Sequence, residues 1–142
     1  MKHEHYDNEF LRGILTSTKT IALVGASHKP DRPSHGVMRF LLSKGYEVIP
    51  VNPGLAGQDL LGQKVVATLA EISKPIDMVD VFRHSSEVPK LMEEVLALKD
   101  LPKVIWMQLG VSDDASAARA EEKGINVVMN RCPAIEIPRL GL

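Results

Sequence analysis

Short apolar runs alternate with longer stretches of helical periodicity along most of the chain. A compact apolar run that ends in glycine, proline or a polar turn predicts a buried strand. Apolar residues spaced three and four apart predict an amphipathic helix. These rules predict five strands: Ile21–Ala26, Glu47–Val51, Asp77–Phe82, Lys103–Leu109 and Asn126–Met129. They also predict four helices: Gly36–Ser43, Thr68–Ser73, Ser86–Leu98 and Asp113–Lys123.

The order of these elements predicts an α/β fold. Strands that alternate with helices at this spacing form parallel βαβ units, because parallel neighbours need a crossover connection. Right-handed crossovers then give a Rossmann-like, doubly wound, mainly five-stranded parallel sheet with helices on both faces. Ser86 is the expected N-cap of the third helix, and Ser112 or Asp113 that of the fourth, which Gly124 is expected to end.

Residues 1–19 are predicted to form an N-terminal helical leader, and residues 20–142 the Rossmann-like domain. One side of the leader is apolar, which predicts packing on its own sheet or on a partner. The residues on that side are Phe10, Leu11, Ile14 and Leu15.

Composition narrows the classes of partner and compartment. A net charge of −1 gives no electrostatic reason to expect nucleic acid or an anionic membrane as partner. The single cysteine, Cys132, excludes an internal disulfide framework and fits a reducing compartment. With neither a signal peptide nor a membrane-spanning run, the sequence predicts a cytoplasmic protein. His3 and His5 lack further ligands beside them, so no metal site is predicted.

Ligands of open parallel sheets bind beyond the carboxyl ends of the strands, where the strand order reverses. The segment Gly25–Arg32 follows the first strand and holds the most informative residues. Gly25 permits a sharp turn and a close approach of a phosphate, while Ala26 and Ser27 keep the side chains small. The other segments at strand ends are Asn52-Pro53, Arg83–Ser86, Leu109–Ser112 and Asn130–Pro133.

The residues after this turn favour an anion. Lys29 and Arg32 add two cations, and Ser34 and His35 open a helix whose free N–H groups attract negative charge. The alternative is a tight strand-to-helix turn that binds nothing. The loop is neither a dinucleotide motif, because Ser27 replaces the second glycine, nor a Walker P-loop.

The second strand ends without the acidic residue that holds a ribose diol in NAD enzymes. An enzyme that uses NAD(P) or another nucleotide therefore stays only as an alternative function. Titration with these nucleotides would separate it from other ligands.

Several motifs together resemble a known family, the small stand-alone CoA-binding proteins of bacteria and archaea. That family's domain is similar to the CoA-binding domain of the succinyl-CoA synthetase α subunit and of ADP-forming acyl-CoA synthetases. The matching motifs are Val24–Ser27, Gly45–Pro53, Val81–Arg83, Glu87–Pro89, Trp106–Val111 and Asn130–Cys132.

The resemblance implies that the loop at Gly25 and the following helix take a CoA phosphate. It further implies that Asn52 and Pro53 line the adenosine end, and that the segment Phe82–Val88 flanks the adenine or the pantetheine arm. The chemistry agrees, because Lys29, Arg32 and Arg83 supply cations for the phosphates of CoA. The predicted ligand-binding residues are Gly25, Ala26, Ser27, Lys29, Arg32, Ser34, His35, Asn52, Pro53, Phe82, Arg83 and Val88.

The sequence thus predicts a protein that binds coenzyme A or acyl-CoA without catalysis of its own. A CoA-sensing regulatory subunit, a homo-oligomer or a chain that works with a partner enzyme subunit remains open. Asn130 stands where the family pattern has Asp, which weakens a general-base role there. Cys132 is expected to be inert or to react with the CoA thiol, and His84 to contact phosphate or solvent.

Overall fold

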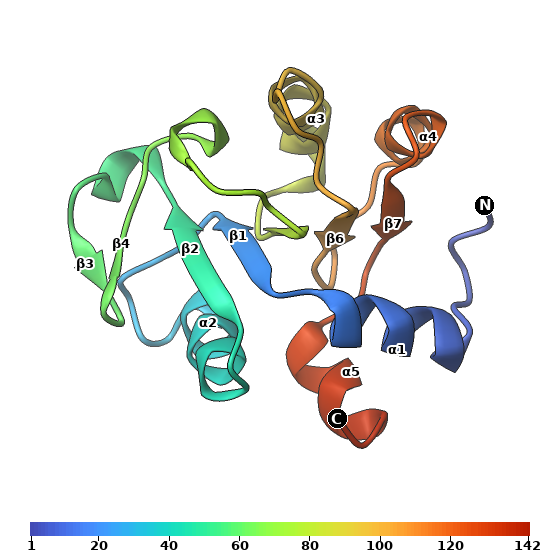
Figure 1. The fold of residues 1–142 in the computed structure, drawn as a ribbon, viewed down its shortest axis with the longest axis horizontal. Helices are drawn as coiled ribbons and strands as arrows, with labels where there is room; N and C mark the ends of the chain where they lie inside the picture. Colours follow the sequence, from blue (N-terminus) through green and yellow to red (C-terminus); the bar gives the residue numbers. More distant parts are fainter.

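The computed structural model describes all of residues 1–142 and contains a five-stranded, entirely parallel sheet (Figure 1). Its strand order is β2-β1-β5-β6-β7, so the chain begins near the centre and winds outward in both directions. This order confirms the predicted Rossmann-like α/β fold. The strands of this sheet are β1 (Thr20–Val24), β2 (Glu47–Val51), β5 (Met78–Val81), β6 (Val104–Met107) and β7 (Asn126–Val128).

Helices cover both faces of the sheet. Figure 1 shows α3 and α4 on one face and α1, α2 and α5 on the other. Neighbouring residues of a strand point to opposite faces, so alternate residues of each strand join different apolar clusters. In β1, for example, Leu23 packs with the α1, α2 and α5 side and Val24 with the other. The helices are α1 (Asn8–Ser17), α2 (Pro33–Ser43), α3 (Val88–Leu96), α4 (Asp114–Glu122) and α5 (Pro133–Arg139).

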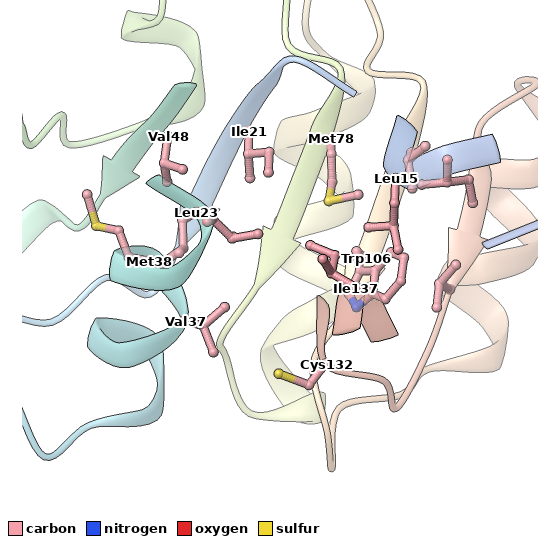
Figure 2. Close-up of a cluster of buried hydrophobic side chains, with 14 of the residues drawn as sticks. Leu15, Ile21, Leu23, Val37, Met38, Val48, Met78, Trp106, Cys132 and Ile137 are labelled. Atoms are coloured by element: carbon pink, nitrogen blue, oxygen red, sulfur yellow. The ribbon is translucent and has the colours of Figure 1, made fainter. Parts of the chain in front are cut away.

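Figure 2 shows the apolar cluster on the α1, α2 and α5 face. Trp106 of β6 is fully buried at its centre, and its indole N–H donates to the Arg131 carbonyl at 2.9 Å. This bond connects the chain after β7 to the sheet. It also satisfies a donor that burial would otherwise leave unpaired.

The leader packs on its own sheet. Leu11, Ile14 and Leu15 of α1 are buried in this cluster, while Phe10 is half-buried against it. The Tyr46 hydroxyl donates to the Leu15 carbonyl at 2.5 Å, which connects the leader to the chain before β2. The α1 helix is therefore part of the same apolar core as α2 and α5.

The helix ends follow the predictions in part. Asp113 is the N-cap of α4, with its carboxylate accepting from the Ser116 N–H at 3.0 Å, and Gly124 follows that helix with φ +83°. The prediction of Ser86 as N-cap is wrong. Ser86 lies inside a short 3₁₀ turn, Ser85–Glu87, whose N-cap is His84, and Glu87 then precedes α3.

Four other features differ from the sequence-based expectation. The predicted helix Thr68–Ser73 is only a 3₁₀ turn over Leu69–Glu71, and a further 3₁₀ turn spans Pro53–Leu55. A small antiparallel hairpin joins β3 (Asp59–Leu60) to β4 (Gln63–Lys64), and α5 also went unpredicted. None of the helices combines the length and the apolar character needed to cross a bilayer.

Candidate functional site

An open cleft of about 740 Å³ lies where the strand order reverses, beyond the carboxyl ends of β1, β2, β5 and β6. This is the place that the open-sheet rule selects, and the volume is within the usual range of small-molecule sites. The residues that line it are Gly25, Ala26, Ser27, His28, Lys29, Arg32, Pro33, Ser34, Val37, Asn52, Gly54, Leu55, Phe82, Arg83, Gln108, Leu109, Val111 and Cys132.

Gly25 makes the turn that opens the cleft. Its φ of +92° suits glycine, and a Cβ added here would lie 2.1 Å from the carbonyl oxygen of Phe82. From the sequence, this glycine was expected to permit a sharp turn and the close approach of a phosphate. The structure adds a different reason, since the end of β1 passes directly against the backbone that follows β5.

Asn52 holds the loop after β1 in place. Its side-chain amide donates to the Ala26 carbonyl at 2.7 Å, and its side-chain oxygen accepts the Gly54 N–H at 2.8 Å. Both ends of the carboxamide are thus used within the protein. Asn52 lines the cleft, and these bonds make it a positioning residue for the loop.

Several backbone N–H groups face this loop without a protein acceptor. The N–H groups of Ser27, His28 and Ser34 form no hydrogen bond within the chain, whereas the Lys29 N–H donates to Ser27 Oγ at 3.1 Å. Ser34 follows Pro33, the first residue of α2, and proline has no N–H of its own. The start of α2 therefore presents free donors and its positive dipole end toward the cleft.

The charged side chains that line the cleft are all of positive sign. Lys29, Arg32 and Arg83 line it, and none of the three forms an ion pair with a carboxylate. No aspartate or glutamate is among the lining residues. Uncompensated cations beside free N–H groups create a positive potential that attracts an anion.

Nine of the predicted ligand-binding residues line this cleft, and three do not. Val88, the first residue of α3, is 1% exposed in the apolar core, so it offers no surface to a ligand. His35 is 6% exposed, and its Nδ1 is buried without a partner. Pro53 is exposed beside the cleft between two lining residues, Asn52 and Gly54.

The set of predicted ligand-binding residues left out one wall of the cleft, although the segments Leu109–Ser112 and Asn130–Pro133 were expected at the site. Gln108, Leu109, Val111 and Cys132 line it from the ends of β6 and β7, and Val37 faces it from α2. Leu109 and Cys132 had been placed at strand ends, but only the cross-strand register shows which of these residues reach the same cleft.

Asn130 and Arg131, which follow β7, make structural contacts. Asn130 has φ +57°, a backbone conformation that asparagine tolerates, and its side-chain oxygen accepts the Gly110 N–H at 2.7 Å. The Arg131 guanidinium lies 5.0 Å from the centroid of the Tyr6 ring. His84 caps the 3₁₀ turn through Ser86 and is absent from the lining of the cleft.

A buried carboxyl group lies in the middle of the sheet. Asp80 of β5 pairs in register with Leu23 and Trp106, so its side chain faces the α1, α2 and α5 side. It is fully buried, and neither carboxylate oxygen has a hydrogen-bond partner. Burial raises the pKa of Asp80 well above its ordinary value, because the charged form loses its solvation.

A second hollow of about 730 Å³ lies between the N-terminal segment and α4. His3 Nδ1 lies 2.6 Å from the Tyr6 hydroxyl and its Nε2 lies 3.1 Å from Glu121, so both ring nitrogens have protein partners. The Tyr6 hydroxyl also accepts the Met129 N–H at 2.8 Å. Together these contacts hold the N-terminal segment against α4 and the residue that follows β7.

The fold and the cleft define a Rossmann-like domain with an open, cation-lined cleft at the switch point of its sheet. A family described as CoA binding domain matches residues 19–138, and the chain belongs to that family. The Bacillus subtilis protein YneT is 43% identical over 86% of this chain and 87% of its own length. The Thermus thermophilus protein solved as cell-free ID.343 is 41% identical, with a TM-score of 0.89 over 95% of this chain and 99% of its own.

A larger relative places the domain in a wider context. The alpha subunit of an ADP-forming acetate–CoA ligase from Pyrococcus furiosus is 32% identical over 84 residues. That match covers 56% of this chain but only 18% of the ligase subunit. The chain is thus related to one part of that subunit.

Proposed function

We propose that this protein binds coenzyme A or an acyl-CoA in the cleft beyond β1, β2, β5 and β6. The observation that carries the proposal is the cluster of three unpaired cations and free N–H groups around the loop at Gly25. Coenzyme A carries a pyrophosphate and a ribose phosphate, which need several donors and cations together. Membership of the CoA-binding family supports this ligand over other phosphorylated molecules.

The proposed contacts pair the phosphates of CoA with the cations and free N–H groups of the cleft, and the base with apolar surface. The N–H groups of Ser27 and Ser34, with Lys29 and Arg32, take phosphate oxygens, and Arg83 takes a phosphate from the opposite wall. The adenosine end lies toward Asn52 and Pro53, whose neighbour Leu55 adds apolar surface for the base.

A nicotinamide nucleotide suits the cleft less well. Asn52 stands at the end of β2, where NAD enzymes carry an acidic ligand for the ribose diol. Its carboxamide is already bonded to Ala26 and Gly54. A ribose hydroxyl would have to displace one of these bonds.

Calorimetric titration with CoA, acetyl-CoA, NAD and NADP in parallel tests the proposal. We expect CoA to bind, and Arg32→Ala to weaken binding by about 1.5–3 kcal/mol, or roughly 10- to 150-fold, for one charge-assisted bond. Arg39→Ala is the matched control, because Arg39 is exposed on α2, the helix that Arg32 precedes, and does not line the cleft. Micromolar NAD binding without CoA binding would overturn the proposal.

A second candidate function is that of a CoA-sensing subunit of a larger acyl-CoA enzyme in the cytoplasm. The relationship to a ligase alpha subunit favours it, and Leu109, which is 56% exposed at the cleft, offers apolar surface there. Size-exclusion chromatography with and without CoA tests for a ligand-dependent homo-oligomer. Affinity capture with the same two samples tests for a partner enzyme chain, and identical partners in both would count against sensing.

A further inference from the structure

The inner end of the cleft is built by hydrogen bonds that continue past the ends of the strands. The Phe82 N–H donates to the Val24 carbonyl at 2.8 Å, and the Gln108 N–H donates to the Val81 carbonyl at 3.2 Å. The Arg131 N–H donates to the Met107 carbonyl at 3.2 Å. These bonds place Gln108 beside the end of β5, and they place Cys132, the residue after Arg131, near the end of β6.

Gln108 brings an unsatisfied carboxamide to this inner end. The residue is 5% exposed and lines the cleft, yet its Oε1 is buried and has no hydrogen-bond donor. A buried polar atom without a partner costs about 1–3 kcal/mol, so it is normally retained where a ligand or another group completes it. A secondary amide complements a carboxamide, because its N–H can donate to Oε1 and its carbonyl can accept from the side-chain NH2.

Cys132 provides a thiol at the same end. It is a free cysteine, 6% exposed, and lines the cleft together with Gln108. Figure 2 shows its sulfur pointing toward Val37 of α2, a residue of the opposite wall. Phe82 packs against the apolar cluster that contains Cys132, and it also lines the cleft. A reagent therefore reaches this sulfur through the cleft, not from the general surface.

We propose that this inner end receives the pantetheine arm and that Cys132 captures oxidised coenzyme A as a mixed disulfide. The proposal rests on the proposed CoA-binding function. The arm carries amides along its length and sulfur at its tip, which matches the carboxamide of Gln108 and the thiol of Cys132 in the lining of the cleft. The phosphate groups, held at the loop near Gly25, orient the arm inward.

The step is a thiol–disulfide exchange with the disulfide of coenzyme A as co-reactant. Cys132 Sγ bonds to one sulfur of that disulfide, the sulfur–sulfur bond breaks, and the other CoA leaves as a thiolate. The departing thiolate takes up the proton that the Cys132 thiol released. Cys132 is oxidised, the departing CoA is reduced, and no further oxidant is required.

Intact-protein mass spectrometry under non-reducing conditions tests this step. The purified chain is incubated with CoA disulfide or with cystamine, which carries the same aminoethylthiol end without the nucleotide. We expect one CoA per chain, released by dithiothreitol, forming about tenfold or more faster than the cystamine adduct because the cleft holds the reacting sulfur in place. Cys132→Ser should form no adduct, and adenosine 3′,5′-bisphosphate should slow the reaction of the natural chain.

A second measurement separates the two proposals. Reduced CoA is titrated into Cys132→Ser by calorimetry, and Arg32→Ala, which retains the thiol, is tested for adduct formation. Weaker CoA binding in Arg32→Ala should slow its adduct by a similar factor. Reversible CoA binding without an adduct, or equal rates with cystamine, overturns the disulfide proposal alone. Failure of CoA to bind at all overturns the proposed function as well.

Discussion

Replacing Gly25 by alanine perturbs the contact that shapes the cleft. Two costs are expected. An alanine in left-handed backbone conformation costs about 1–2 kcal/mol relative to glycine. Its Cβ would also lie 2.1 Å from the Phe82 oxygen and 2.9 Å from the Phe82 carbonyl carbon. Both atoms belong to backbone, which cannot rotate away, and forcing such an overlap costs about 1–3 kcal/mol more.

Gly45 provides a matched control. Its φ of +91° is nearly the same as the +92° of Gly25, but a Cβ added there meets no atom within 4 Å. Alanine at Gly45 should therefore lower the free energy of unfolding by only the backbone cost, about 1–2 kcal/mol. At Gly25 the loss should be about 2–5 kcal/mol, which is the sum of the two costs. The gain from a stiffer unfolded chain is the same in both variants and cancels.

Urea denaturation followed by circular dichroism measures this difference. For slopes of about 1–3 kcal/mol per molar urea, the midpoint of Gly25→Ala should fall below that of Gly45→Ala by about 1 M. Equal midpoints in the two variants would refute the conclusion that Gly25 is required by contact with Phe82. Gly25→Ala should also bind CoA more weakly, because β1 and the following loop must shift.

Three further predictions concern the loop, the leader and the buried acid. Asn52→Asp keeps the acceptor for the Gly54 N–H but loses the donor to Ala26, so calorimetry should show CoA affinity falling by about 0.5–1.5 kcal/mol; unchanged affinity would contradict the positioning role. Tyr6→Phe leaves the buried Met129 N–H without an acceptor and should lower the free energy of unfolding by about 1–3 kcal/mol in urea. Asp80→Asn removes an acid whose pKa is raised by burial, so the stability of the natural chain relative to the variant should be greatest below pH 3.8 and fall as pH rises toward the folded-state pKa. A pH-independent difference between the two chains would show that Asp80 does not titrate on unfolding.

The parallel sheet could be predicted because each strand is a compact apolar run between turn residues. The short helix α5 could not, since it spans only seven residues and contains Pro138 in its interior. Its start at Pro133 does follow a recognised preference for proline at the first helical position. The same preference at Pro33 would have moved the start of α2 three residues earlier than the predicted Gly36.

The sequence predicted which strand ends form the candidate site. It predicted less well which side chains point into the cleft. Gly25, Ser27 and Arg32 follow β1 directly, and the open-sheet rule alone places them at the cleft. Val88 shows the opposite case. Its spacing with Leu91 and Val95 placed it on the buried face of a helix, and packing into the core prevailed over the family-based expectation of ligand contact. Gln108 reaches the cleft only because the hydrogen bonding of β5 and β6 continues past their ends.

Amide chemical shifts of the ¹⁵N-labelled chain, recorded as CoA is added, test the central claim most directly. The signals of Ser27, His28 and Ser34 should move most, because their N–H groups lack protein acceptors and face the proposed phosphates. Saturable shifts centred on these residues would support the anion site at the start of α2. Shifts centred on Ser112 and Glu121 at the second hollow, or none at all, would contradict it.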